Sequence, residues 1–66
     1  MLSEEVRIGM RVKVSSAHIR SDLRGLTGVV EQMYGHPAYR ALEVRLENGR
    51  CELFWHYELK RENAFV

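Results

Sequence analysis

The sequence predicts an all-β domain, a small five-stranded barrel with one short helical turn before the last strand. Two observations support this fold class. Asn48-Gly49 separates two runs in which apolar and polar residues alternate, a pattern typical of a β-hairpin. Gly25 and Gly28 lead directly into a β-branched pair, as in a chain that turns tightly and then enters a bent strand.

The length of 66 residues fits one domain, which we place at residues 8–61, between a loose N-terminal segment (1–7) and a frayed C-terminus (62–66). A chain this short buries only about 60% of the surface that its unfolded form exposes. Its single cysteine cannot form an intramolecular disulfide, so a compact core must supply the stability. No apolar run approaches the roughly 20 residues of a membrane span, and the acidic start is not that of a signal peptide. We therefore expect a cytoplasmic protein with no membrane contact.

The first strand is predicted at Met10–Ser15, where apolar and polar residues alternate. Its inward side chains are the apolar ones, Met10, Val12 and Val14. A polar loop, Ser16–Arg24, follows this strand, and we expect Ile19 and Leu23 to fold back over the open side of the barrel. The second strand is predicted at Gly28–Met33 with Val30 inward, and a loop with the only proline follows it.

The hairpin around Asn48-Gly49 predicts a definite register. A two-residue turn of type I′ places three pairs on the buried face: Leu46 with Cys51, Val44 with Leu53 and Leu42 with Trp55. Phe54 then points to solvent. One tight turn that covers the end of the barrel is predicted at His56–Leu59, and a brief last strand is predicted at Lys60-Arg61.

This order of elements resembles that of the Src-homology-3-like small barrels over residues 8–61. Arg24-Gly25-Leu26-Thr27-Gly28-Val29-Val30 is similar to the core pattern of KOW-type modules of transcription and ribosomal proteins, which implies nucleic-acid binding. Asp22–Val30 also resembles a stretch of the variable chain of ferredoxin–thioredoxin reductase. That chain and a small stromal chain of photosystem I are barrel-shaped accessory chains of redox complexes, so this second resemblance implies an accessory role.

No group of residues points to catalysis or to a cofactor. Cys51 is the only thiol, and the predicted register turns it inward, where it acts as a small buried hydrophobe. His18, His36 and His56 stand 18 and 20 residues apart, which matches no local metal-ligand motif, and loop histidines are usually solvent-facing. We therefore expect no enzyme, no metal site and no cofactor.

Aromatic and arginine side chains on the loops point to a protein partner, because these residue types dominate interface energetics. The residues that we expect to contact it are Arg20, Arg24, Tyr34, Tyr39, Arg40 and Phe54. Trp55 and Tyr57 are expected to close the end of the barrel. An exposed strand edge and these aromatic residues leave both a monomer and a homodimer open.

Nucleic-acid binding is the alternative function. Residues 6–30 hold five basic residues and one acid, so this half can present a basic face. The residues that would contact phosphates are Arg11, Lys13, Arg20 and Arg24. The chain as a whole has ten basic residues and nine acids, so binding requires that one face be strongly segregated.

Overall fold

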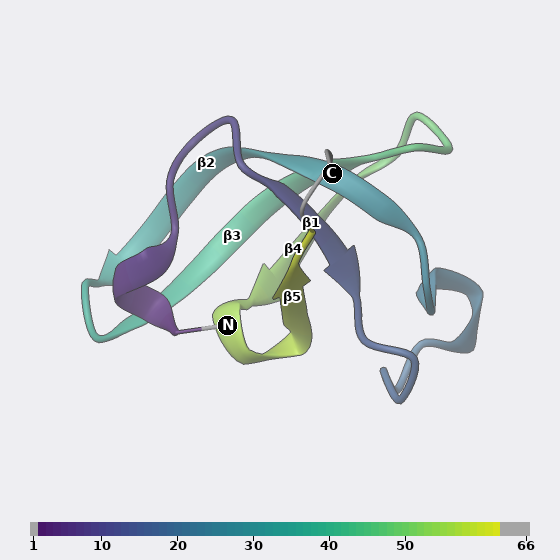
Figure 1. Ribbon diagram of the computed structural model, residues 1–66, viewed down its shortest axis with the longest axis horizontal. Helices are drawn as coiled ribbons and strands as arrows, with labels where there is room; N and C mark the ends of the chain where they lie inside the picture. Colours follow the sequence, from purple (N-terminus) through teal and green to yellow (C-terminus); the bar gives the residue numbers. More distant parts are fainter. Residues whose placement is uncertain (1, 63–66) are drawn as a thin grey trace.

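The computed structural model describes residues 2–62 and contains one five-stranded antiparallel sheet (Figure 1). The strands are β1 (Arg11–Val14), β2 (Thr27–His36), β3 (Tyr39–Leu46), β4 (Cys51–Trp55) and β5 (Leu59–Arg61). Three short 3₁₀ turns join them or precede them: η1 (Ser3–Glu5), η2 (Ser21–Leu23) and η3 (His56–Glu58). The all-β class, the five strands and the helical turn before the last strand are therefore confirmed. No helix in residues 2–62 is long and apolar enough to span a membrane.

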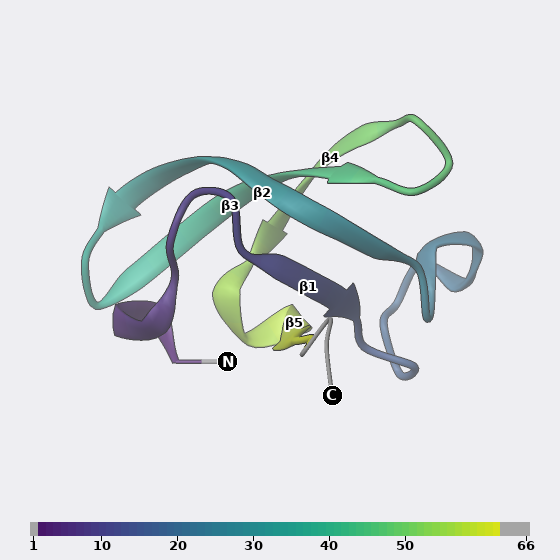
Figure 2. The same ribbon diagram turned by 45° about the horizontal axis from the view of Figure 1, so that its top comes forward.

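The strand order is β4-β3-β2-β1-β5, and within the described residues β4 and β5 are the two edges of the sheet. These pairings form an open sheet and do not show the expected closed barrel. The long β2–β3 hairpin arches over β1 and η3 (Figure 2). A register shift between Val30 and Gln32 interrupts the pairing of β2 with β3, as a β-bulge does where a strand bends.

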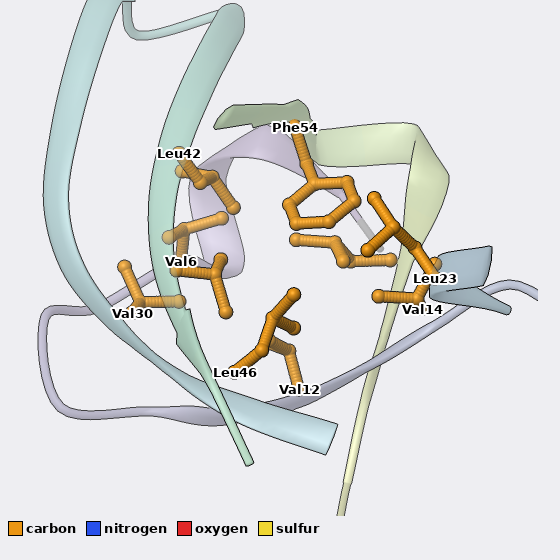
Figure 3. Close-up of a cluster of buried hydrophobic side chains, with 10 residues drawn as sticks. Val6, Val12, Val14, Leu23, Val30, Leu42, Leu46 and Phe54 are labelled. Atoms are coloured by element: carbon orange, nitrogen blue, oxygen red, sulfur yellow. The ribbon is translucent and has the colours of Figure 1, made fainter. Parts of the chain in front are cut away.

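The concave side of the sheet holds one hydrophobic core (Figure 3). Its buried members are Val6, Val12, Val14, Leu23, Val30, Leu42, Val44, Leu46, Phe54 and Leu59. The predicted inward positions of β1 and of Val30 are confirmed, although Met10 is only half-buried. Leu23 folds over the core as expected, but Ile19 is 87% exposed, so that expectation is wrong for Ile19.

The N-terminal residues contribute more than the loose segment that the sequence indicates. Val6 belongs to the core, and Ser3 Oγ donates a hydrogen bond to the carbonyl of Pro37 at 2.7 Å. Glu62 N–H donates to the carbonyl of Arg11, which extends the contact of β5 with β1. From residue 63 on, the expected fraying falls outside the described residues.

Glycine is required for different reasons at Gly25, just before β2, and at Gly28, within β2. Gly25 has a φ of +76°, a conformation that other residues adopt only with strain. Gly28 lies so close to β3 that a Cβ atom there would sit 2.5 Å from the carbonyl oxygen of Arg45. The predicted tight turn and close backbone approach are therefore both present.

The predicted register of the β3–β4 hairpin is wrong by one residue. The structure pairs Leu42 with Phe54, Glu43 with Leu53 and Ala41 with Trp55. A type I′ turn needs a positive φ at both Asn48 and Gly49, but only Gly49 has one, at +90°. Leu46 N–H donates to the Arg50 carbonyl at 2.7 Å, so residues 47–49 form a three-residue loop.

This shift exchanges the two faces of β4, because successive side chains of a strand point to opposite sides. Phe54 is 2% exposed, so the prediction that it contacts a partner is wrong. Leu53 is 65% exposed and Trp55 41% exposed, and Cys51 is exposed as well. The inward positions predicted on β3, at Leu42, Val44 and Leu46, are confirmed.

Candidate protein-binding surface

Three exposed aromatic rings meet at one end of the sheet. Tyr39 of β3 lies 4.7 Å from Trp55 of β4 and 6.0 Å from Tyr57 of η3, measured between ring centroids. The hydroxyls of Tyr39 and Tyr57 are 3.5 Å apart, and their hydrogen bond raises the pKa of Tyr57 above its usual value. We call these three residues the aromatic patch. Mutual packing holds the rings in place although all three remain exposed, so a partner would find them already ordered.

Two adjoining hollows border the aromatic patch. One, of about 250 Å³, lies between Ile19 and Tyr57. The other, of about 340 Å³, lies between Ile19 of the loop after β1 and the strand residues Leu53 and Trp55. Both share His18 and Glu58 as lining residues. Apolar side chains thus flank a surface depression that two polar groups line.

His18 and Glu58 are held in place by several hydrogen bonds. His18 Nε2 lies 3.1 Å from Glu58 Oε2, and His18 Nδ1 accepts the backbone N–H of Arg20 at 3.0 Å. Because Nδ1 accepts a hydrogen bond, the proton of the neutral ring sits on Nε2 and is donated to Glu58. The other Glu58 oxygen accepts the backbone N–H of Trp55 at 2.8 Å. The expectation of solvent-facing histidines is therefore wrong for His18, which is 8% exposed and packs edge-on to Phe54.

The predicted arginines of the loop lie beside these hollows but are already bonded. Arg20 forms ion pairs of 3.2 Å with both Asp22 and Glu52. Arg50 contacts the same two carboxylates, so this group of four charges is neutral as a whole. Arg24 Nε donates to the carbonyl of His18, which ties the start of the loop to its end.

The remaining predicted contact residues are spread along the β2–β3 hairpin. Tyr39 belongs to the aromatic patch, and Tyr34 lies on the same sheet face, since it pairs with Ala41 and Ala41 pairs with Trp55. The Tyr34 hydroxyl donates to Glu43 at 2.9 Å, which raises the pKa of Tyr34. Arg40 is half-buried, with Nη1 at 3.7 Å from the sulfur of Met33.

Four exposed residues that line this surface are not among the predicted contact residues: Ile19, Leu53, Trp55 and Tyr57. Leu53 and Trp55 were placed in the core by the two-residue turn. A three-residue loop ending in Gly49 is the other common connection for the same sequence and would have identified both. For Ile19 and Tyr57, the only indication of exposure in the sequence is that each lies between two polar residues.

A second group of side chains lies on the β1–β5 ribbon. Arg11, Lys13, Lys60 and Arg61 are exposed, and none of them forms an ion pair with another described residue. Lys13 and Lys60 are direct cross-strand partners and line a hollow of about 360 Å³ together with Ser15. Of the four residues predicted for phosphate contact, Arg11 and Lys13 lie here, whereas Arg20 and Arg24 lie beside the aromatic patch.

Side chains for metal binding do not gather anywhere in residues 2–62, where no three His, Cys, Asp or Glu residues lie close enough to hold an ion. Cys51 is a free thiol on the outer face of β4, which corrects the prediction that it is buried.

Comparison with known proteins adds no relative to these observations. No protein-family model matches the chain, and neither a curated protein nor a solved structure does. The aromatic patch with its two hollows and the cations of the β1–β5 ribbon are the features of the structure that bear on function.

Proposed function

We propose that this chain is a non-catalytic binding module that docks a protein partner on the aromatic patch and the adjoining hollows. The observation that carries the proposal is the packing of Tyr39, Trp55 and Tyr57, which come from three elements and stay exposed. Exposed aromatic residues that gather around apolar depressions are typical of protein interfaces, where Tyr and Trp carry much of the binding energy.

The charges around the hollows indicate which kind of side chain the partner presents. Arg20 and Arg50 already bind Asp22 and Glu52, so these four side chains offer no net charge to an ionic partner. The side chains that remain open to contact are apolar, with Ile19 the most exposed of them. The partner would therefore insert apolar side chains on either side of Ile19.

We also propose that the sheet forms a Src-homology-3-like barrel. Supporting this architecture, the arch of β2 and β3 lies over β1 and η3 (Figure 2), and Leu23 of the loop between β1 and β2 belongs to the core. The bond between His18 and Glu58 joins that loop to η3, between the two edge strands. A barrel of this kind is compatible with an accessory role and with a cytoplasmic location.

The test is affinity capture from native lysate with and without nuclease, using the wild-type chain and two variants with native circular dichroism. Ile19→Ser with Tyr57→Ala should lose the captured partner, because it removes apolar contacts from both sides of one hollow. Tyr34→Ala is the matched control, since Tyr34 is as exposed as Tyr39 but lies outside the patch. Capture that persists in the double variant contradicts the proposed surface, and capture that nuclease abolishes points to nucleic acid.

A second candidate function is nucleic-acid binding of the KOW-like kind. The observation that favours it is the placement of Lys13 directly opposite Lys60, since like charges in this position are destabilising without an anion nearby. Each phosphate that such a protein neutralises on a single strand contributes about −0.7 to the slope of log K against log salt. Fluorescence anisotropy with a labelled single-stranded oligonucleotide should give a salt slope that falls by about 1.4 in Lys13→Ala with Lys60→Ala. Arg45→Ala is the control, because Arg45 is paired with Glu31, and an unchanged slope in the lysine variant contradicts this candidate.

A further inference from the structure

We propose that two copies of this chain associate through the free edge of β4, pairing antiparallel about a two-fold axis at Leu53. This interface overlaps the docking surface proposed above, because Leu53 and Trp55 also line the hollow beside Ile19. Three features of this edge support the pairing: its backbone groups, the side chains along it, and the charges that select the register.

The backbone of β4 has hydrogen-bonding groups left over on one side. Leu46 N–H donates to Arg50, and Val44 and Leu42 pair with Glu52 and Phe54. Because alternate residues of an antiparallel strand bond to the same neighbour, Cys51, Leu53 and Trp55 direct their backbone groups away from β3. Trp55 N–H accordingly reaches Glu58 on that side. For the backbone of Cys51 and Leu53, residues 2–62 supply no partner at this edge.

The side chains along this edge lack the features that normally prevent edge-to-edge pairing. Strand edges are usually blocked by lysine, proline, a bulge or an inward charge. On its outer face β4 carries only Cys51, Leu53 and Trp55, and its pairing with β3 is regular. Glu52 is charged, but Arg20 and Arg50 neutralise it. The opposite edge, β5, carries Lys60 and Arg61 and is protected in this way.

The charges select a second copy in one register. With the axis at Leu53, its N–H and carbonyl bond the same groups of Leu53 in the second copy. Glu52 then faces Phe54 of the second copy, and Cys51 faces Trp55, so no like charges meet. Glu58 occupies the Trp55 N–H, so in this register the Cys51–Trp55 pairs keep only the bond from Cys51 N–H to the Trp55 carbonyl. Moving the axis to Glu52 would place two carboxylates opposite each other, and moving it to Phe54 would leave only the bonds from Leu53 N–H to the Trp55 carbonyl. The axis at Leu53 therefore keeps the most backbone bonds with no like charges opposed, and this self-complementary pattern favours a copy of the same strand.

The interface is short, and interfaces that bury less than about 1,200 Å² usually belong to weak complexes. The dimer should therefore be weak, and its population should depend on protein concentration. Sedimentation velocity over a wide range of concentrations should show wild-type monomer and dimer in exchange. Leu53→Lys should be monomeric throughout, because two ammonium groups would meet at the axis. Leu53→Pro should also be monomeric and folded, since the monomer does not use the Leu53 N–H. Leu53→Val is the matched control and should still dimerise.

Disulfide trapping tests the register directly. Leu53→Cys in a Cys51→Ser chain places two thiols in a hydrogen-bonded pair with Cα atoms about 5.5 Å apart, which a disulfide can bridge. We expect this variant to form a covalent dimer on mild oxidation and the wild type, whose Cys51 faces Trp55, to form none. A monomeric wild type at every concentration, or a dimer unaffected by Leu53→Lys, would overturn the inference. Ile19→Ser with Tyr57→Ala should leave dimerisation unchanged, so this interface and the docking surface can fail independently.

Discussion

Glu58 binds His18 through one carboxylate oxygen at 3.1 Å and the backbone of Trp55 through the other at 2.8 Å. One side chain therefore joins the loop after β1 to the end of β4. This bond positions the lining of both hollows beside the aromatic patch.

Glu58→Ala should destabilise the fold by about 1–3 kcal/mol, because it leaves the buried His18 Nε2–H and the Trp55 N–H without an acceptor. Glu58→Gln should lose less, since its amide oxygen can still accept one of these bonds. Urea denaturation monitored by tryptophan fluorescence gives both free energies of unfolding. Glu4→Ala is the control, because Glu4 is an exposed acid in η1. Equal stability of Glu58→Ala and Glu4→Ala would show that the contact contributes nothing.

Phe54→Ala should cost about 3–5 kcal/mol, the usual loss for a buried aromatic residue, which can unfold a domain of this size. Trp55→Ala should cost much less, because Trp55 remains 41% exposed. Thermal denaturation followed by circular dichroism ranks the two variants. The register of a two-residue turn predicts the opposite order. A larger loss of stability in Trp55→Ala than in Phe54→Ala would therefore contradict the register of the structure.

Gly28→Ala should be more damaging than Gly25→Ala. A Cβ at Gly28 would lie 2.5 Å from the Arg45 carbonyl oxygen, so the backbone of β3 must move, whereas a Cβ at Gly25 meets no atom within 4 Å. Gly25→Ala carries only the strain of its positive φ, about 1–2 kcal/mol. Chemical denaturation of both variants measures the difference. If the two lose the same stability, the close approach of β2 to β3 is not the reason for glycine at position 28.

Tyr34 should make stability depend on pH in the alkaline range. Its hydrogen bond to Glu43 raises its pKa above 10.0, so the folded chain holds this proton more tightly than the unfolded chain. The contribution is fully present below the unfolded pKa and is lost as the pH rises through the raised one. Tyr34→Phe should therefore lose less stability than wild type as the pH rises past about 10. Urea denaturation at several alkaline pH values tests this, and parallel losses in both chains would contradict it.

Much of the fold could be read from local patterns. The alternation in β1 and β3 identified their inward residues, because a half-buried strand repeats every second residue. Gly25 and Gly28 identified a turn before β2 and a close approach within it, for reasons of backbone sterics. Packing of Val6 and exposure of Ile19 could not be read in this way, since both depend on which distant residues lie beside them.

The candidate site was predicted in part. Of the residues predicted to contact a partner, Tyr39 belongs to the aromatic patch and Arg20 lines one hollow, whereas Phe54 is buried. Trp55, predicted to face the core, is exposed. One residue in the length of the hairpin loop causes both errors, because a shift of one position exchanges the faces of a strand.

The sequence by itself determined that this chain forms a hairpin around Asn48-Gly49, because alternation and the turn residues are local properties. Only the tertiary structure decided the register. Glu47, freed from pairing by the longer loop, accepts hydrogen bonds from the backbone and hydroxyl of Thr27 on β2. Phe54 then enters the core against His18, which is distant from it along the chain. These contacts join segments that local patterns cannot place together, and they determine which face of β4 a partner can reach.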